Sequence, residues 1–109
     1  MKTYNPGVTI SLLAAADIVK HRFMKPDGNY AGADGLSIGV SDATTDSGRM
    51  APVVVTGVGL IEAAGAITQG VKVYSDATGK GTATGTNNPG GIALDAASGA
   101  GEYIRVKLV

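Results

Sequence analysis

The chain has 109 residues, which is enough for one domain. Its nine acidic and nine basic side chains give a net charge of zero, which argues against a nucleic-acid-binding protein, because such proteins usually bind through a basic face. The lack of cysteine excludes disulfides and thiolate metal sites. No stretch approaches the roughly 20 apolar residues of a membrane span, so we expect no nucleic-acid or membrane partner.

The apolar content predicts a thin core. Hydrophobic residues make up 44% of the chain, but many are alanines, and there are one Phe, four Tyr and no Trp. Such side chains bury little area each. The apolar surface that remains would be covered by self-association or by a larger body, although a monomer with scattered exposed alanines is also compatible with this composition.

The N-terminus is predicted to be an extended arm followed by a strand. Residues 1–7 are polar and end in Asn-Pro-Gly, a strong turn signal. We therefore expect an arm over 1–7 and a single domain over 8–109. Residues 8–12 alternate between apolar and polar side chains and predict a strand.

Residues 13–24 fit two structures. Four apolar residues lie near helical spacing: Leu13, Ala16, Val19 and Phe23. Residues 20–25 equally fit a short strand that runs into a turn at 26–29. The pattern alone leaves helix and strand open.

The rest of the chain predicts short strands separated by turns. The expected strands are 36–40, 50–58, 71–75, 91–94 and 103–109, with 60–63 either continuing the second or starting another. The apolar run Val53–Val55 is expected to be buried on both faces. In the last strand Ile104, Val106 and Leu108 share one face, opposite Arg105 and Lys107. We predict an all-β fold: a small single-domain β-barrel or sandwich of short antiparallel strands.

The segment Gly79-Lys80-Gly81-Thr82 suggests a phosphate-binding loop but does not match its requirements. The position five residues before Gly79 is Tyr74 rather than Gly, and Lys80 is followed by Gly81 rather than Ser or Thr. We expect instead a turn over 76–80, in which Asp76 bonds its own backbone and Gly79 takes a positive φ.

No catalytic or metal-binding pattern stands out. His21, the only histidine, lies between Lys20 and Arg22 with no carboxylate or nucleophile nearby in sequence. The aspartates are spread singly, mostly where turns begin. We expect no enzymatic activity, no metal and no cofactor. The basic cluster Lys20, Arg22 and Lys25 is either a solvated face or a docking surface for an acidic protein surface.

The C-terminal half, "GAITQGVKVYSDATGKGTATG" followed by "GGIALDAASGAGEYIRVKL", resembles the small phage capsid decoration, or cement, proteins. The matching positions are Gly70, Val73, Tyr74, Asp76 and Thr78, then Gly91, Ile92, Ala93, Leu94, Ala96, Ala97 and Gly99, then Val106 and Leu108. The front half matches at Tyr4, Pro6, Gly7, Thr9 and Ile10 and through "VVVTGVGLIEAAGAITQG". The chain departs from the family at 13–35.

The resemblance implies a structural virion protein with no enzymatic activity or cofactor. Such proteins form trimers that bind the outer surface of the head over three-fold and local three-fold axes and stabilise it, so the implied partners are the major capsid protein and two further copies of the chain. The implied location is the outer capsid surface, after synthesis in the cytoplasm of the bacterial host. The resemblance also makes Arg22–Met24 a strand, and it assigns capsid contact to the arm, at Lys2, Thr3, Tyr4, Asn5 and Pro6.

A second hypothesis is a β-rich binding module of a phage tail or fibre, with a glycan as a candidate ligand. A glycan site usually needs exposed aromatic rings, and the candidates are Tyr4, Tyr30, Tyr74 and Tyr103.

Overall fold

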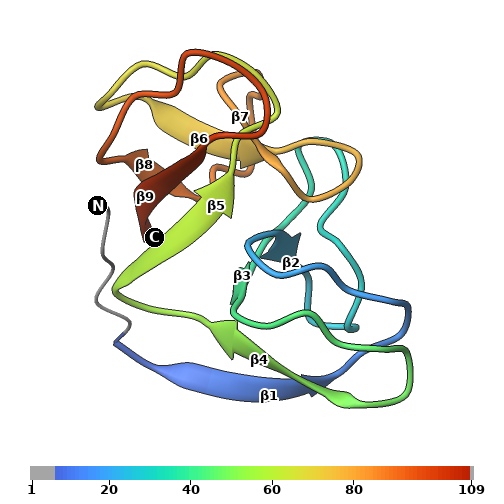
Figure 1. Ribbon diagram of the computed structural model, residues 1–109. Coiled ribbons are helices and arrows are strands. Elements are labelled where there is room, and N and C mark those ends of the chain that lie inside the picture. The colour runs from blue at the N-terminus through green and yellow to red at the C-terminus, as the bar shows by residue number, and fades with distance from the viewer. Residues whose placement is uncertain (1–6, 109) are drawn as a thin grey trace.

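The computed structural model describes residues 7–108, which form an all-β domain with no helix in that range (Figure 1). Its strands are β1 (Thr9–Leu13), β2 (Phe23–Met24), β3 (Gly39–Ser41), β4 (Met50–Val54), β5 (Val58–Glu62), β6 (Lys72–Ser75), β7 (Gly81–Thr82), β8 (Gly91–Ala93) and β9 (Tyr103–Leu108). The predicted fold class is confirmed. The predicted residues 1–6 of the arm lie outside the described range.

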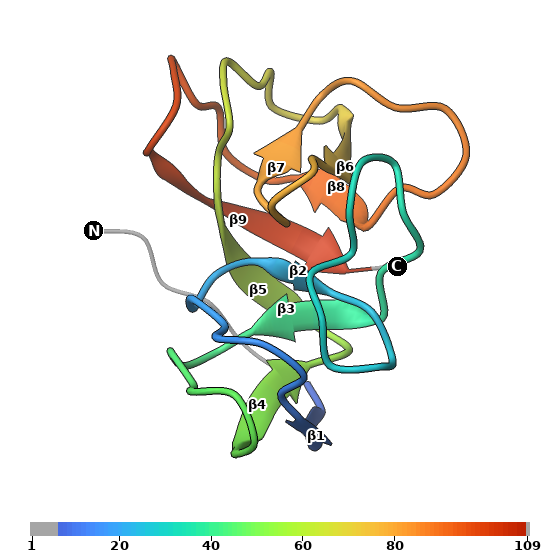
Figure 2. The same ribbon diagram turned by 90° about the vertical axis from the view of Figure 1, so that its right-hand side faces the viewer.

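The strands form two antiparallel sheets. The first has the order β1-β4-β3-β2 and the second the order β5-β9-β8-β6-β7. β9 is the last strand in the chain, yet it lies inside the second sheet between β5 and β8 (Figure 2). The second sheet therefore depends on pairing between segments far apart in sequence.

The chain passes between the sheets at residues 55–57. The sequence predicted a single strand over 50–58, but β4 ends at Val54 and β5 begins at Val58, and the two strands belong to different sheets (Figure 1). Gly57 has a φ of 88°, a conformation that side chains with a Cβ rarely adopt. This glycine redirects an apolar run that would otherwise read as one continuous strand.

Two clusters of buried side chains lie on opposite faces of the first sheet. Val54 belongs to the larger cluster, which includes Ile61, Ile104 and Val106 of the second sheet. The adjacent Val53 belongs to the smaller cluster, with Ile18 and Met24. Successive side chains of a strand point to opposite faces, so β4 is buried on both sides, as its apolar run predicts.

Residues 13–24 form no helix, and their end forms β2, which settles the open choice in favour of the strand. Phe23 is fully buried in the larger cluster and Met24 in the smaller one. Gly90 makes room for the ring, because a Cβ built there would lie 2.4 Å from Phe23 Cε1. The only phenylalanine of the chain therefore joins the core through a two-residue strand.

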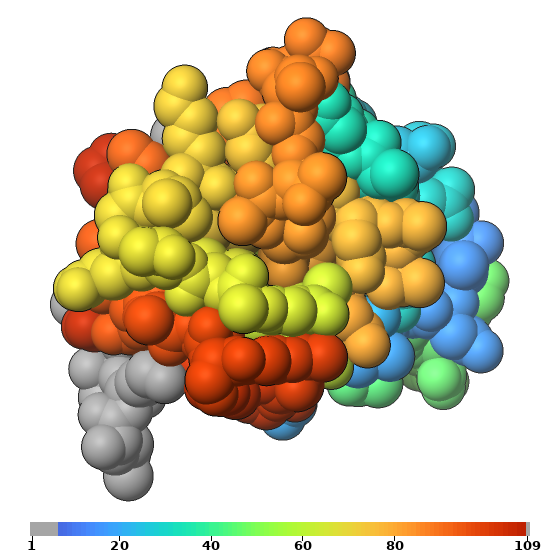
Figure 3. Space-filling view, turned by 90° about the horizontal axis from the view of Figure 1, so that it is seen from above, coloured from blue at the N-terminus to red at the C-terminus, as the bar shows by residue number. Residues whose placement is uncertain are grey.

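The loops at one end of the domain pack against one another. Ile67 and Ala97 form an isolated antiparallel bridge, and the amide of Gly101 donates to Ala63 O at 2.9 Å. In the space-filling view the yellow residues near 65 and the red-orange residues near 100 lie side by side (Figure 3). This end is thus held by backbone contacts as well as by the core.

Candidate functional site

The turn at residues 76–80 has the structure that its sequence predicts. Asp76 Oδ1 accepts hydrogen bonds from the amides of Thr78 at 2.8 Å and Lys80 at 2.9 Å, and Gly79 has a φ of 83°. Gly79 O accepts from the amide of Phe23 at 2.7 Å. The turn therefore attaches the second sheet to β2 of the first.

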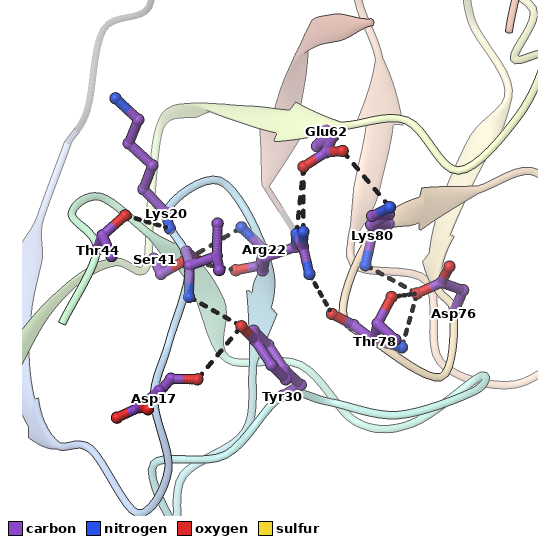
Figure 4. Close-up of polar contacts among 11 residues, drawn as sticks. Asp17, Lys20, Arg22, Tyr30, Ser41, Thr44, Glu62, Asp76, Thr78 and Lys80 are labelled. Atoms are coloured by element: carbon purple, nitrogen blue, oxygen red, sulfur yellow. Dashed lines mark hydrogen bonds and ion pairs between the residues drawn. The ribbon is translucent and has the colours of Figure 1, made fainter. Parts of the chain in front are cut away.

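Arg22, one of the predicted docking residues, is engaged inside the molecule. Its guanidinium lies 3.2 Å from Glu62 Oε1, donates from Nη1 to Thr78 O at 3.1 Å, and lies 5.6 Å from the centre of the Tyr30 ring. The side chains of Arg22 and Glu62 are only 13% and 16% exposed. Glu62 Oε2 also lies 3.5 Å from Lys80 Nζ. We call Arg22, Glu62, Thr78 and Lys80 the Glu62 clasp (Figure 4).

The clasp joins three separate segments. Arg22 directly precedes β2, Glu62 ends β5, and Lys80 closes the 76–80 turn. The Glu62 carboxylate thus forms ion pairs with two cations from different parts of the chain. An ion pair buried to this degree loses much of its hydration, so losing one partner costs more than losing a surface pair.

Lys20 and Lys25, the other predicted docking residues, lie apart from the clasp. Lys20 is exposed, and its side chain points away from Arg22 (Figure 4). Lys25 Nζ lies 3.7 Å from Asp27 Oδ2, and both side chains are substantially exposed. The three basic residues are neighbours in sequence but do not form one cationic surface.

His21 lies between the exposed Lys20 and the largely buried Arg22, and its backbone has an unusual conformation. Its φ is 65°, and its ring packs edge-on against Tyr103 at a centroid distance of 5.3 Å. Burial, with a smaller effect of Lys20, lowers the pKa of His21 below its ordinary value, while Asp42 and Glu62 oppose the shift. The neutral imidazole is therefore favoured in the folded protein.

A second carboxylate ties two loops together. Asp34 accepts hydrogen bonds from three successive backbone amides, those of Thr86, Asn87 and Asn88, at 3.1 to 3.3 Å. These bonds lower the pKa of its carboxyl group, with those from Asn88 and Thr86 contributing most. Asp34 thereby fixes the loop before β8 against the loop before β3.

The outer face of the second sheet presents a group of side chains that the sequence patterns did not identify. Residues paired directly across neighbouring strands point to the same face. The register pairs Lys72 with Ile92, Ile92 with Lys107, and Lys107 with Val58, so these four form one row across β6, β8, β9 and β5. We call this row the lysine row. The alternation of apolar and polar residues in 103–109 predicted which face Lys107 lies on. Its neighbours on the adjacent strands follow only from the strand order.

The tyrosines differ widely in exposure. Tyr74 is buried, as are its neighbours Val73 and Ser75 in β6. The Tyr30 hydroxyl accepts from the amide of Val19 at 2.8 Å, and Tyr103 is 45% exposed. Tyr4 lies outside the described residues. Of the candidate glycan-stacking rings within 7–108, Tyr103 is therefore the most accessible.

Pockets, metal clusters and membrane-spanning helices are absent from residues 7–108. Between 7 and 108 there is no pocket, and no three His, Asp or Glu side chains come together as a possible metal site. Within that range there is also no helix that is long and apolar enough to cross a membrane.

Comparisons with known proteins identify a family and a similar fold. A family model described as phage cement protein matches residues 1–108. The solved structure of the head fiber gp8.5 N base in bacteriophage phi29 has a similar fold, with a TM-score of 0.75 over 94% of this chain and 93% of that chain, at 16% sequence identity. No curated protein sequence matches the chain.

Proposed function

The chain belongs to the phage cement protein family and is a capsid-associated structural protein of a phage; from this premise we propose that it binds the outer surface of the head at three-fold and quasi-three-fold positions and stabilises it. The observation that carries the proposal is the family match over residues 1–108. The domain acts as a trimer on the major capsid protein, through surface contacts and without enzymatic activity.

The physics of such binding suits a small domain with a thin core. A modest contact, made by each of three linked copies, binds far more tightly than any one contact alone, because the second and third contacts form at a high effective concentration. The Glu62 clasp and the Asp34 bonds support this role by holding the loops of each copy in one shape. A preorganised surface loses less entropy on binding.

The direct test combines three measurements. Analytical ultracentrifugation of the purified chain is expected to give three times its monomer mass. Incubation with undecorated heads of the same phage, followed by pelleting, is expected to carry the chain down at a saturating, fixed copy number. Decorated heads should also withstand a higher temperature than bare heads before they release DNA. A monomer that stays in the supernatant contradicts the proposal.

The arm is tested separately by deleting residues 1–6. We expect weaker attachment to heads and an unchanged unfolding temperature, because Gly7, which stays in the variant, donates its amide to Thr56 O at 2.9 Å. Unchanged attachment would remove Lys2, Thr3, Tyr4, Asn5 and Pro6 from the contact surface.

A fibre module is the second candidate function, and the fold similarity to the base of a phi29 head fiber favours it. Cryo-electron microscopy of heads with the bound chain separates the two. A cement protein lies on the shell as a compact trimer, whereas a fibre base carries a further density that projects outward.

A further inference from the structure

The lysine row combines exposed charge with exposed apolar surface on one sheet face. Lys72 and Lys107 are exposed, and Ile92 between them is 37% exposed. Among the described residues, neither lysine lies within ion-pair distance of a carboxylate. The row is therefore a cationic strip with an apolar centre.

Two carboxylates next to this face, those of Asp95 and Glu62, are engaged by other cations. Arg105 lies two residues before Lys107 on the same face of β9. It donates hydrogen bonds from Nε and Nη2 to the Asp95 carboxylate, both at 2.9 Å. Glu62 is held by Arg22 and Lys80 in the clasp. Both acids are thus neutralised locally, which leaves the charge of Lys72 and Lys107 uncompensated at the surface.

The apolar neighbours favour a protein partner over a nucleic acid. Val58 and Leu60 are partly buried on this same face, and Tyr103 is exposed at its far end. Protein interfaces typically have an apolar centre and a polar rim. Nucleic-acid sites instead need many closely spaced cations to replace phosphate counterions, and this face has two free lysines.

The charge also disfavours the same face of a second copy. In a two-fold contact the same patch lies on both sides of the interface, so this face would bring the two lysines of one copy close to the two lysines of the other. Like charges brought together in this way oppose association. The complementary occupant is a surface that offers carboxylates around an apolar contact.

We propose that the lysine row, Lys72, Ile92, Lys107 and Val58, is the docking surface of the chain for an acidic patch on the protein shell of the head. This inference rests on the proposed function and names the face that carries it. Ile92 supplies the desolvated centre of the contact, and the two lysines fix its register and accelerate association.

The test compares two double charge reversals that change net charge equally. The variant K72E/K107E alters the row. The comparison variant K25E/R49E alters two basic residues next to strands of the first sheet, and it also tests Lys25, which the sequence offered as a docking candidate but which the structure places beside Asp27. We expect the first variant to bind undecorated heads about tenfold more weakly or worse, and the comparison variant to bind within about twofold of the wild type. The weakening should shrink in high salt, where charge interactions are screened.

A third variant tests the apolar centre. Ile92→Thr keeps a β-branched residue in the strand but removes most of its apolar surface, and we expect severalfold weaker binding with no change in salt dependence. Thermal unfolding of all variants checks that each is folded. Equal losses in K72E/K107E and the comparison variant would overturn the inference, as would wild-type affinity in K72E/K107E.

The failures of the two proposals can be told apart. If the wild type pellets with heads and K72E/K107E does so equally well, the proposed function stands and the docking face is wrong. If the wild type does not pellet at all, both proposals fail. Binding of duplex DNA by the wild type that K72E/K107E abolishes would assign the row to nucleic acid instead.

Discussion

The Glu62 clasp and the lysine row use basic residues in opposite ways. Arg22 and Lys80 share one carboxylate in a largely buried position and join the two sheets. Lys72 and Lys107 lie on an open sheet face with no carboxylate partner among the described residues. The comparison shows that basic residues clustered in sequence, at 20–25, are divided between a structural ion pair and separate surface sites, whereas lysines 35 positions apart share one row.

If this division holds, changes in the clasp reduce stability and changes in the row reduce binding alone. Glu62→Ala should have the largest effect. It leaves the Arg22 guanidinium, 13% exposed, without its carboxylate. We expect a loss of about 2–3 kcal/mol in the free energy of unfolding, measured with chemical denaturant. Asp46→Ala, which removes an exposed acid from the loop before β4, is the control, and an equal loss there would show that the clasp has no special role.

Gly79→Ala tests the turn that completes the clasp. An alanine at this position would have to adopt a φ of 83°, and its Cβ would lie 2.9 Å from both Phe23 O and Tyr30 Cδ1. Gly48 has a similar φ of 85° but open space around it, so Gly48→Ala isolates the cost of the backbone conformation. We expect about 2 kcal/mol of destabilisation for the first and about 1 kcal/mol for the second. Equal values would mean that the turn does not press against β2.

We expect acid to lower the stability of the folded protein through protonation of His21. Because burial lowers its pKa in the folded protein, stability is complete above the unfolded pKa of about 6.5 and falls as the pH drops below it towards the lowered folded pKa. His21→Asn removes the titration and tolerates the positive φ. The stability difference between pH 7.5 and pH 5.5 should therefore be smaller in this variant. An unchanged pH profile would place the responsible group elsewhere.

The smallest stability effect is expected in the row itself. Lys72→Ala with Lys107→Ala removes two exposed side chains that make no ion pair with the described residues, so the unfolding free energy should change by less than about 0.5 kcal/mol per site. The same variant should still bind heads more weakly. A large loss of stability would mean that the lysines support the sheet rather than a partner.

Much of the fold follows from local patterns in the sequence. The alternation in 103–109 identified the buried face of β9, and Asp76 with Gly79 identified the turn after β6. The division of residues 50–58 into two strands could not be predicted. Val53 and Val54 are buried in two different clusters, so the run shows no alternation of apolar and polar residues that would mark where one strand ends. Residues 13–24 were ambiguous for a related reason, since Ile18, Phe23 and Met24 are buried in clusters on opposite sides of a sheet.

The candidate site was harder to predict than the fold. Burial of Arg22 depends on Glu62 and on Tyr30, residues that local sequence does not connect to it. The lysine row depends on the strand order β6-β8-β9-β5, which places β9 beside two strands from different parts of the chain. Local patterns give the direction of a side chain, but only the pairing of strands gives its neighbours.

The position of β9 has a consequence for how the protein is made. Until Tyr103–Leu108 have left the ribosome, β5 and β8 have no strand between them and the apolar side chains of the second sheet stay uncovered. A chain truncated before residue 103 lacks the strand that closes this sheet. Because the apolar side chains of β5 and β8 would then lack their partner strand, we expect such a truncated chain not to form a stable domain.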